Sequence, residues 1–200
     1  MASGIKSKPV YSPLRADTRG RYHLMLGLGA GRSALARVIG ELRAAAPALL
    51  ERTRVLFVPD GDEWAEPFQT LGLAQAQVFA DAGALLEELR TVLERSLMGT
   101  RLYVAGPEHF IGRALRTALE FDLNKDEIGA EDIGTLARRL YCVHCRTTTE
   151  GVRTNIAACT GCGRWLLVRD HYSRRLAAYM GVMVDAEAPG DLPPIQEAYP

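Results

Sequence analysis

The chain has 200 residues, enough for one domain of ordinary size and a smaller second one. Its 24 basic and 24 acidic side chains give a formal net charge of zero, so no overall charge directs it to nucleic acid or to a membrane surface. The N-terminus has no apolar core of a signal peptide, and no apolar run is long enough to span a bilayer. These features predict a soluble, cytoplasmic protein.

Residues 1–20 are rich in Ser, Pro, Lys and Arg and are predicted to form an N-terminal arm. After the arm, short apolar runs alternate with amphipathic stretches. The predicted strands are 23–28, 54–58, 77–79 and 102–105, and the predicted helices are 34–45, 83–97 and 108–121. This alternation predicts a parallel sheet with right-handed crossovers. The expected fold class is therefore α/β, a three-layer sandwich over residues 21–138.

A second, smaller domain is predicted over residues 139–184. A short helix at 135–140 is expected to lead into it, a strand is expected at 165–168, and Asp170 is expected to open a helix at 174–180 that ends at Gly181. Pro, Gly and acidic residues dominate 185–200, which predicts an extended or disordered tail.

The cysteines of the chain form two Cys-x-x-Cys pairs with thirteen residues between them. This spacing is typical of a zinc ribbon, in which four thiolates hold one structural zinc ion. Gly161 and Gly163 are predicted to allow the positive-φ turn that such a site needs, and His144 is interpreted as a polar residue of the turn. Rubredoxin-type iron, a [2Fe–2S] cluster and disulfides remain alternatives. The predicted metal ligands are Cys142, Cys145, Cys159 and Cys162.

Two glycine turns follow predicted strands of the first domain. A strand, a glycine turn and a helix begin a nucleotide-binding α/β unit, so these turns are a candidate site for NAD(P)H or flavin. Acidic residues after the second strand would repel the 2′-phosphate of NADP(H). The candidate cofactor residues are Gly29, Gly31, Arg32, Ser33, Gly106, Pro107 and Glu108, and the acidic residues are Asp60, Asp62, Glu63 and Glu66.

The first domain resembles the pyridine-nucleotide domain of ferredoxin–NADP reductase-like proteins. Residues 102–108 with the helix after them resemble the strand-Cys-Gly-Pro-helix element of that family, and 128–134 resembles the closing strand of its phthalate dioxygenase reductase branch. Residues 29–34 occupy the position of the family's glycine loop. Ala105 stands where those reductases usually have a cysteine, so the resemblance implies a degenerate reductase domain.

The two cysteine pairs with their thirteen-residue spacing, followed by residues 168–182, resemble the C-terminal domain of the small zinc-ribbon subunit of bacterial dimethylamine monooxygenase. The resemblance implies a multi-subunit enzyme that uses O2 and reduced pyridine nucleotide to convert dimethylamine to methylamine and formaldehyde. It places haem on one partner, and flavin with a [2Fe–2S] cluster on a reductase partner. This chain would be the zinc-carrying accessory subunit that docks these partners and supports electron transfer.

Two other functions remain open: an NAD(P)H-binding oxidoreductase component acting with a flavin partner, and a zinc-ribbon nucleic-acid adaptor. Six arginines between 141 and 175 favour the adaptor. No residue is predicted to be catalytic. Asp170 and His171 are adjacent, so in an extended segment they point to opposite faces, and we interpret them as helix-capping or interface residues. His109 is interpreted as a pocket or surface residue.

Overall fold

The computed structural model describes residues 7–60, 73 and 75–200. It divides into two compact units. One unit is Tyr11–Gly134, and the other is Thr135–Pro200 with the N-terminal residues through Val10. No helix among the described residues is long and apolar enough to cross a membrane.

The larger unit contains a five-stranded sheet with the strand order β3-β2-β1-β4-β5, in which every pair of neighbours is parallel. Its central strand is almost fully buried on both faces, as expected where helices cover both sides of a parallel sheet. The sheet confirms the predicted α/β class. The strands are β1 Tyr22–Leu28, β2 Thr53–Val58, β3 Gln75–Val78, β4 Thr100–Gly106 and β5 Ile128–Asp132.

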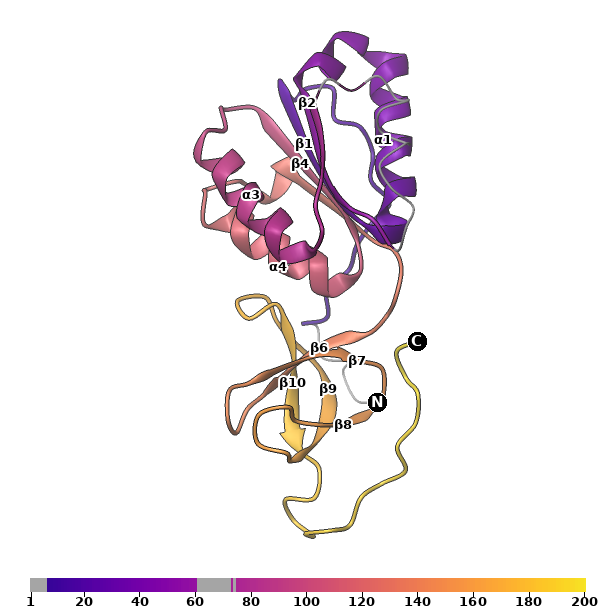
Figure 1. The fold of residues 1–200 in the computed structure, drawn as a ribbon, viewed down its shortest axis with the longest axis vertical. Coiled ribbons are helices and arrows are strands. Elements are labelled where there is room, and N and C mark those ends of the chain that lie inside the picture. Colours follow the sequence, from indigo (N-terminus) through magenta and orange to yellow (C-terminus); the bar gives the residue numbers. More distant parts are fainter. Residues whose placement is uncertain (1–6, 61–72, 74) are drawn as a thin grey trace. The chain divides into compact units, whose positions relative to one another are not determined.

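Helix α1 (Arg32–Ala45) covers one face of the sheet, and α3 (Ala82–Glu94) and α4 (Glu108–Leu119) cover the other (Figure 1). Alternate residues of β1 therefore enter different cores, since Met25 packs with α1 while Leu24 packs with α3 and α4. Each fully buried apolar side chain of this size contributes about 1.5–3 kcal/mol. In the described part of the chain, three short 3-10 helices lie at the ends of strands and helices: Gly29–Gly31, Pro47–Arg52 and Lys125–Glu127.

The segment before β1 packs against the α1 side of the sheet. Leu14 is buried in the core that α1 covers. Its backbone N–H donates to the Glu131 carboxylate over 2.6 Å, and Arg37 pairs with the same carboxylate. The backbone N–H of Asp17 donates to the Tyr103 hydroxyl over 3.0 Å. These contacts hold the chain on β4 and β5 before it enters β1.

The smaller unit is a second five-stranded sheet, with the order β7-β6-β10-β9-β8. Strands β6 and β10 pair in parallel, the other neighbours pair antiparallel, and the sheet curls into a nearly closed barrel (Figure 1). Its core consists mainly of aliphatic and tyrosine side chains together with two of the cysteines. The strands are β6 Arg138–Cys142, β7 Thr148–Val152, β8 Ile156–Ala158, β9 Trp165–Ser173 and β10 Ala178–Met183.

Both helices predicted for the smaller unit are wrong. Residues 138–140 of the predicted helix 135–140 belong to β6, and 178–180 of the predicted helix 174–180 belong to β10, after a turn that ends β9. Strand β10 lies between β6 and β9, so its backbone is hydrogen-bonded on both sides. These strand pairings override a weak local preference for helix. The structure therefore contains a hairpin where the sequence predicted a ribbon strand and a helix.

The C-terminal segment has no helix and is bound to the barrel near its end. The backbone N–H of Asn155 donates to the Gln196 carbonyl over 3.0 Å, and that of Leu136 donates to the Pro200 carbonyl over 2.7 Å. The Tyr199 ring stacks on the guanidinium of Arg138, whose Cζ atom lies 3.8 Å from the ring centroid.

Candidate metal centre

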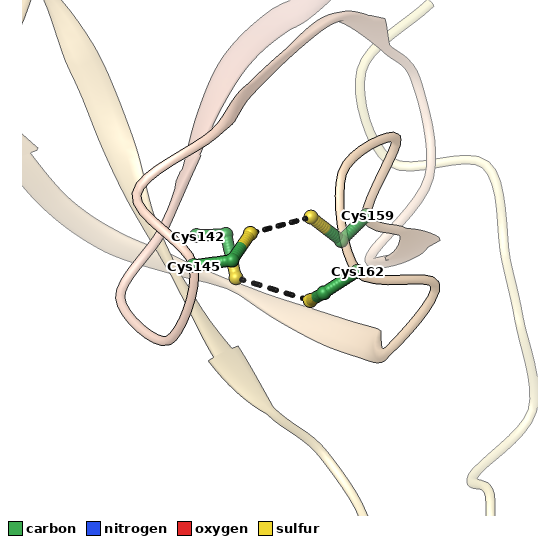
Figure 2. A group of neighbouring side chains, drawn as sticks. All are labelled: Cys142, Cys145, Cys159 and Cys162. Carbon is green, nitrogen blue, oxygen red and sulfur yellow. Dashed lines mark hydrogen bonds between the residues drawn. The ribbon is translucent and has the colours of Figure 1, made fainter.

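The four cysteines come together at one end of the barrel, and their sulfur atoms all lie within 4.8 Å of one another (Figure 2). The Cys145 and Cys159 sulfurs are 3.5 Å apart, and those of Cys142 and Cys162 are 3.9 Å apart. A tetrahedral site with Zn–S bonds of about 2.3 Å places its sulfurs about 3.8 Å apart, whereas a disulfide bond is about 2.05 Å long. The thiols are therefore free, and their arrangement fits a tetrahedral metal ion.

Two knuckles with the same backbone conformation supply these cysteines. In the first, the N–H of Arg146 donates to the Cys142 carbonyl over 2.9 Å, and in the second the N–H of Gly163 donates to the Cys159 carbonyl over 3.0 Å. Arg146 and Gly163 both have positive φ, 67° and 72°. Each turn brings its second cysteine back beside its first.

A second hydrogen bond closes each knuckle, from Cys142 N–H to the Thr147 carbonyl and from Cys159 N–H to the Arg164 carbonyl, both over 2.9 Å. The positive φ predicted for Gly161 is wrong, because this residue is not among those with positive φ. Gly161 is needed for space instead, since a Cβ there would lie 2.3 Å from the Thr147 hydroxyl oxygen.

Hydrogen bonds to sulfur favour the thiolate form of several cysteines. The hydroxyl and the backbone N–H of Thr147 lower the pKa of the Cys145 thiol to about 6, and hydrogen bonds from Arg164 lower the pKa of Cys162. The backbone N–H of Gly161 donates to the Cys159 sulfur over 3.4 Å. Burial raises the pKa of Cys142 to about 11, so a bound cation is needed to hold all four as thiolates.

Four protein ligands complete a tetrahedral coordination shell and leave no position for substrate or water. Such a centre stabilises structure and does not activate a substrate. His144 is exposed and does not belong to the cluster.

A cleft of about 350 Å³ lies where β1 and β2 end and α1 begins. It brings together Gly29, Arg32 and Ser33 of the predicted cofactor residues. Gly31 packs on β4, since a Cβ there would lie 2.2 Å from the Ala105 carbonyl oxygen. Gly106, Pro107 and Glu108 do not line this cleft; its lining residues are Gly29, Ala30, Arg32, Ser33, Phe57, Pro59 and Asp60.

Acidic groups lie close to both glycine turns. The Asp60 carboxylate is next to Gly29, where an added Cβ would lie 2.5 Å from a carboxylate oxygen. Glu108 is buried in the first turn of α4, and the Tyr11 hydroxyl donates to it over 3.4 Å. A carboxylate at a helix N-terminus takes the place that favours a phosphate. These two positions therefore fit a dinucleotide poorly, and Asp62, Glu63 and Glu66 lie outside the described residues.

Asp170 does not cap a helix as predicted, because it and His171 lie within β9. The Asp170 carboxylate pairs with Arg138 over 2.8 Å. The Arg138 guanidinium lies between the Tyr179 and Tyr199 rings, at 4.0 and 3.8 Å from their centroids. No sequence pattern indicated this arrangement. The role of Thr147 had a signal, since it follows its knuckle at the same spacing as Arg164.

Comparison with known proteins places both units in one family. Residues 3–128 match the N-terminal domain, and residues 139–182 the C-terminal domain, of the family described as dimethylamine monooxygenase subunit DmmA-like. The heme-dependent oxidative N-demethylase delta subunit of Ectopseudomonas mendocina (strain ymp) is 32% identical over 170 residues, which are 84% of this chain and 82% of that relative.

Among solved structures, the ferredoxin reductase in carbazole 1,9a-dioxygenase (FAD apo form) superposes with a TM-score of 0.50 and 18% identity. The match covers 60% of this chain but only 37% of the reductase, so it shows a common reductase-like fold and no more. The two matched domains and the identity to the delta subunit show the family directly. The chain belongs to the dimethylamine monooxygenase subunit DmmA-like family.

Proposed function

We propose that this chain is a zinc-binding accessory subunit of a multi-subunit, haem-dependent dimethylamine monooxygenase. The family description and the name of the delta-subunit relative support the assignment. The complete enzyme would use O2 and NAD(P)H to convert dimethylamine to methylamine and formaldehyde. This chain would dock the haem-containing catalytic subunit and the flavin/[2Fe–2S] reductase subunit and support electron transfer between them.

The closed four-cysteine cluster is the observation that carries the accessory role. It is the one group of three or more His, Cys, Asp or Glu side chains positioned for a metal within the described part of the chain. A closed thiolate site binds no substrate, so oxygen activation and hydride transfer belong to the partners. A bound zinc would tie the end of β6 to the knuckle after β8 and contribute on the order of 10 kcal/mol to the folding of the barrel.

Elemental analysis together with a visible absorption spectrum of the purified chain tests the metal assignment. One zinc per chain and a colourless solution are expected. Iron with visible absorption would instead make the cysteines a redox centre and the chain an electron carrier.

The assembly role is tested by mixing the zinc-loaded chain with the haem and reductase subunits and measuring complex formation by native mass spectrometry. Absence of any complex would reject that role.

The second candidate function is an NAD(P)H-binding component, and the cleft beside Arg32 and Ser33 is the observation that favours it. Calorimetric titration with NADH, in the presence of the partner subunits, tests this function. Micromolar binding that is weakened by Arg32→Ala would support it. Absence of binding heat would reject this function and leave the α/β unit with a docking role. The carboxylates of Asp60 and Glu108 favour this second outcome, because both lie beside the glycine turns.

A further inference from the structure

Both knuckles carry side chains around the cysteine cluster that are exposed or, for Arg164, half-buried. We propose that this knuckle face, made of Val143, His144, Arg146, Arg164 and Trp165, is the surface through which the chain docks an acidic protein surface of another subunit. The inference rests on the proposed function and adds to it the surface used and the chemistry of the partner.

The knuckle face exposes apolar area in a way that a structural turn does not require. Val143, which follows β6, is 44% exposed, and Trp165, the first residue of β9, is 38% exposed. Trp and Arg are the side chains that most often dominate the binding energy of protein interfaces. An exposed tryptophan that directly follows an arginine therefore favours an interface over a solvated loop.

These residues lie within one patch because the cluster ties the two knuckles together. The sulfurs lie within 4.8 Å of one another, and every residue of the knuckle face is at most three positions from a cysteine. At about 3.8 Å per residue, each lies within roughly 11 Å of its cysteine along the chain. The patch therefore fits within the roughly 800 Å² that each partner contributes to an interface of standard size.

Charge identifies the partner as acidic. The two acidic residues of β7 and β9 are already paired, Glu150 with Arg139 over 2.7 Å and Asp170 with Arg138 over 2.8 Å. Arg146 and Arg164 form no ion pair with any residue that the structure describes, and Arg164 instead donates to the Cys162 sulfur. A carboxylate on a partner would supply the missing ion pair of Arg146.

A protein suits the knuckle face better than a nucleic acid does. Val143 offers an aliphatic contact that neither a phosphate nor a stacked base needs. The other four arginines between 141 and 175 lie on separate elements: Arg153 lies between β7 and β8, Arg169 on β9, and Arg174 and Arg175 in the turn between β9 and β10. A phosphate backbone would require a continuous cationic track.

The test measures binding of the full, zinc-loaded chain to the separately purified haem and reductase subunits by biolayer interferometry. The double variant Arg146→Glu/Trp165→Ala changes the knuckle face and leaves Arg164 at its sulfur. The matched control, Arg175→Glu/Leu192→Ala, makes the same charge change and removes an apolar side chain of 36% exposure elsewhere on this unit. Zinc content and the thermal unfolding midpoint verify that both variants fold.

The knuckle variant is expected to raise the dissociation constant for one partner at least about tenfold, and the control to change it less than about twofold. Raising the salt from about 50 to 300 mM should weaken partner binding by the wild type more than binding by the knuckle variant.

If the wild type and the knuckle variant bind the partner equally well, the proposal is overturned and the proposed function is unaffected. If the wild type binds neither subunit, both the docking proposal and the proposed function are rejected. If the isolated chain binds a 20-nucleotide DNA or RNA and the knuckle variant does not, the knuckle face is a nucleic-acid-binding surface and the proposal is overturned.

Discussion

Gly161 of the second knuckle lies against Thr147 of the first, so closely that a Cβ at 161 would lie 2.3 Å from the Thr147 hydroxyl oxygen and 2.7 Å from its Cβ. The Thr147 hydroxyl and backbone N–H both hydrogen-bond the Cys145 sulfur. The close approach of the two knuckles therefore fixes the position of Thr147, which in turn orients the Cys145 thiolate. Residues that orient metal ligands through hydrogen bonds strongly affect metal affinity.

Gly161→Ala is accordingly expected to weaken zinc binding about 10- to 100-fold, because the added methyl group displaces Thr147 from Cys145. Competition with a chromophoric zinc chelator measures the affinity. Gly40→Ala is the matched control, since Gly40, like Gly161, has no positive φ, and no heavy atom lies within 4 Å of the position of its added Cβ. Equal zinc affinity of the two variants would show that the close approach has no role at the site.

Removal of the metal is expected to unfold the barrel and leave the α/β unit folded. Among the described residues, the hydrophobic cluster of the barrel has eight buried members, two of which are Cys142 and Cys159, whereas the α/β unit has a larger cluster on each face of its sheet. Hydrogen exchange measured by mass spectrometry, before and after chelation, should show loss of protection across β6–β10 and retained protection across β1–β5. Zinc addition should restore it. Unchanged exchange of the metal-free barrel would mean that its apolar core is sufficient.

The sequence predicted the α/β unit well because its strands are short apolar runs separated by clear helical periodicity. Strand β1 and helix α1 are examples, with the glycine turn between them. The knuckles were also predictable, since Cys-x-x-Cys spacing has few structural outcomes. Strand β10 was not predictable in this way. A run such as Ala178–Met180 fits a helix or a strand equally well until its neighbours, β6 and β9, are known.

The candidate site shows the same division between local and distant information. The grouping of the four cysteines follows from their spacing along the chain, and so does the role of Thr147, because it repeats the position of Arg164. The environment of Arg138 depends on contacts with residues far along the chain, Asp170 and Tyr199. No local pattern marks such a residue, so only the folded structure reveals it.

Arg138→Ala is expected to lower the free energy of unfolding of the barrel by about 2–3 kcal/mol, since it removes a buried cation stacked between Tyr179 and Tyr199. Arg138→Lys should recover only part of this loss, because an ammonium group cannot stack with its whole plane on both rings. Urea unfolding of the zinc-loaded protein measures the change. The exposed Arg175→Ala is the control and should stay within about 0.5 kcal/mol of the wild type. A similar small change for Arg138→Ala would contradict the stabilising role of the stack.

Asp17 should make the stability of the α/β unit depend on pH. Hydrogen bonds from Arg19 and Arg101, over 2.8–2.9 Å, hold the pKa of the Asp17 carboxyl well below its usual range, although burial opposes them. A folded-state pKa below the unfolded value of about 3.9 means that the ionised carboxylate stabilises the fold above that pH. This stabilisation is then lost as the pH falls further, toward the folded-state pKa.

Asp17→Asn is therefore expected to lower the free energy of unfolding by about 1 kcal/mol at pH 7, and the difference from the wild type should shrink as the pH falls below about 4. Urea unfolding followed by far-ultraviolet circular dichroism at pH 7, 5, 4 and 3 measures both curves. Burial also lowers the pKa of the nearby His23, and the charge of Asp17 opposes this shift. Asp191→Asn, at an exposed position, should follow the wild type throughout. A difference for Asp17→Asn that stays constant from pH 7 to pH 3 would show that the lost stability comes from packing and not from the carboxylate charge.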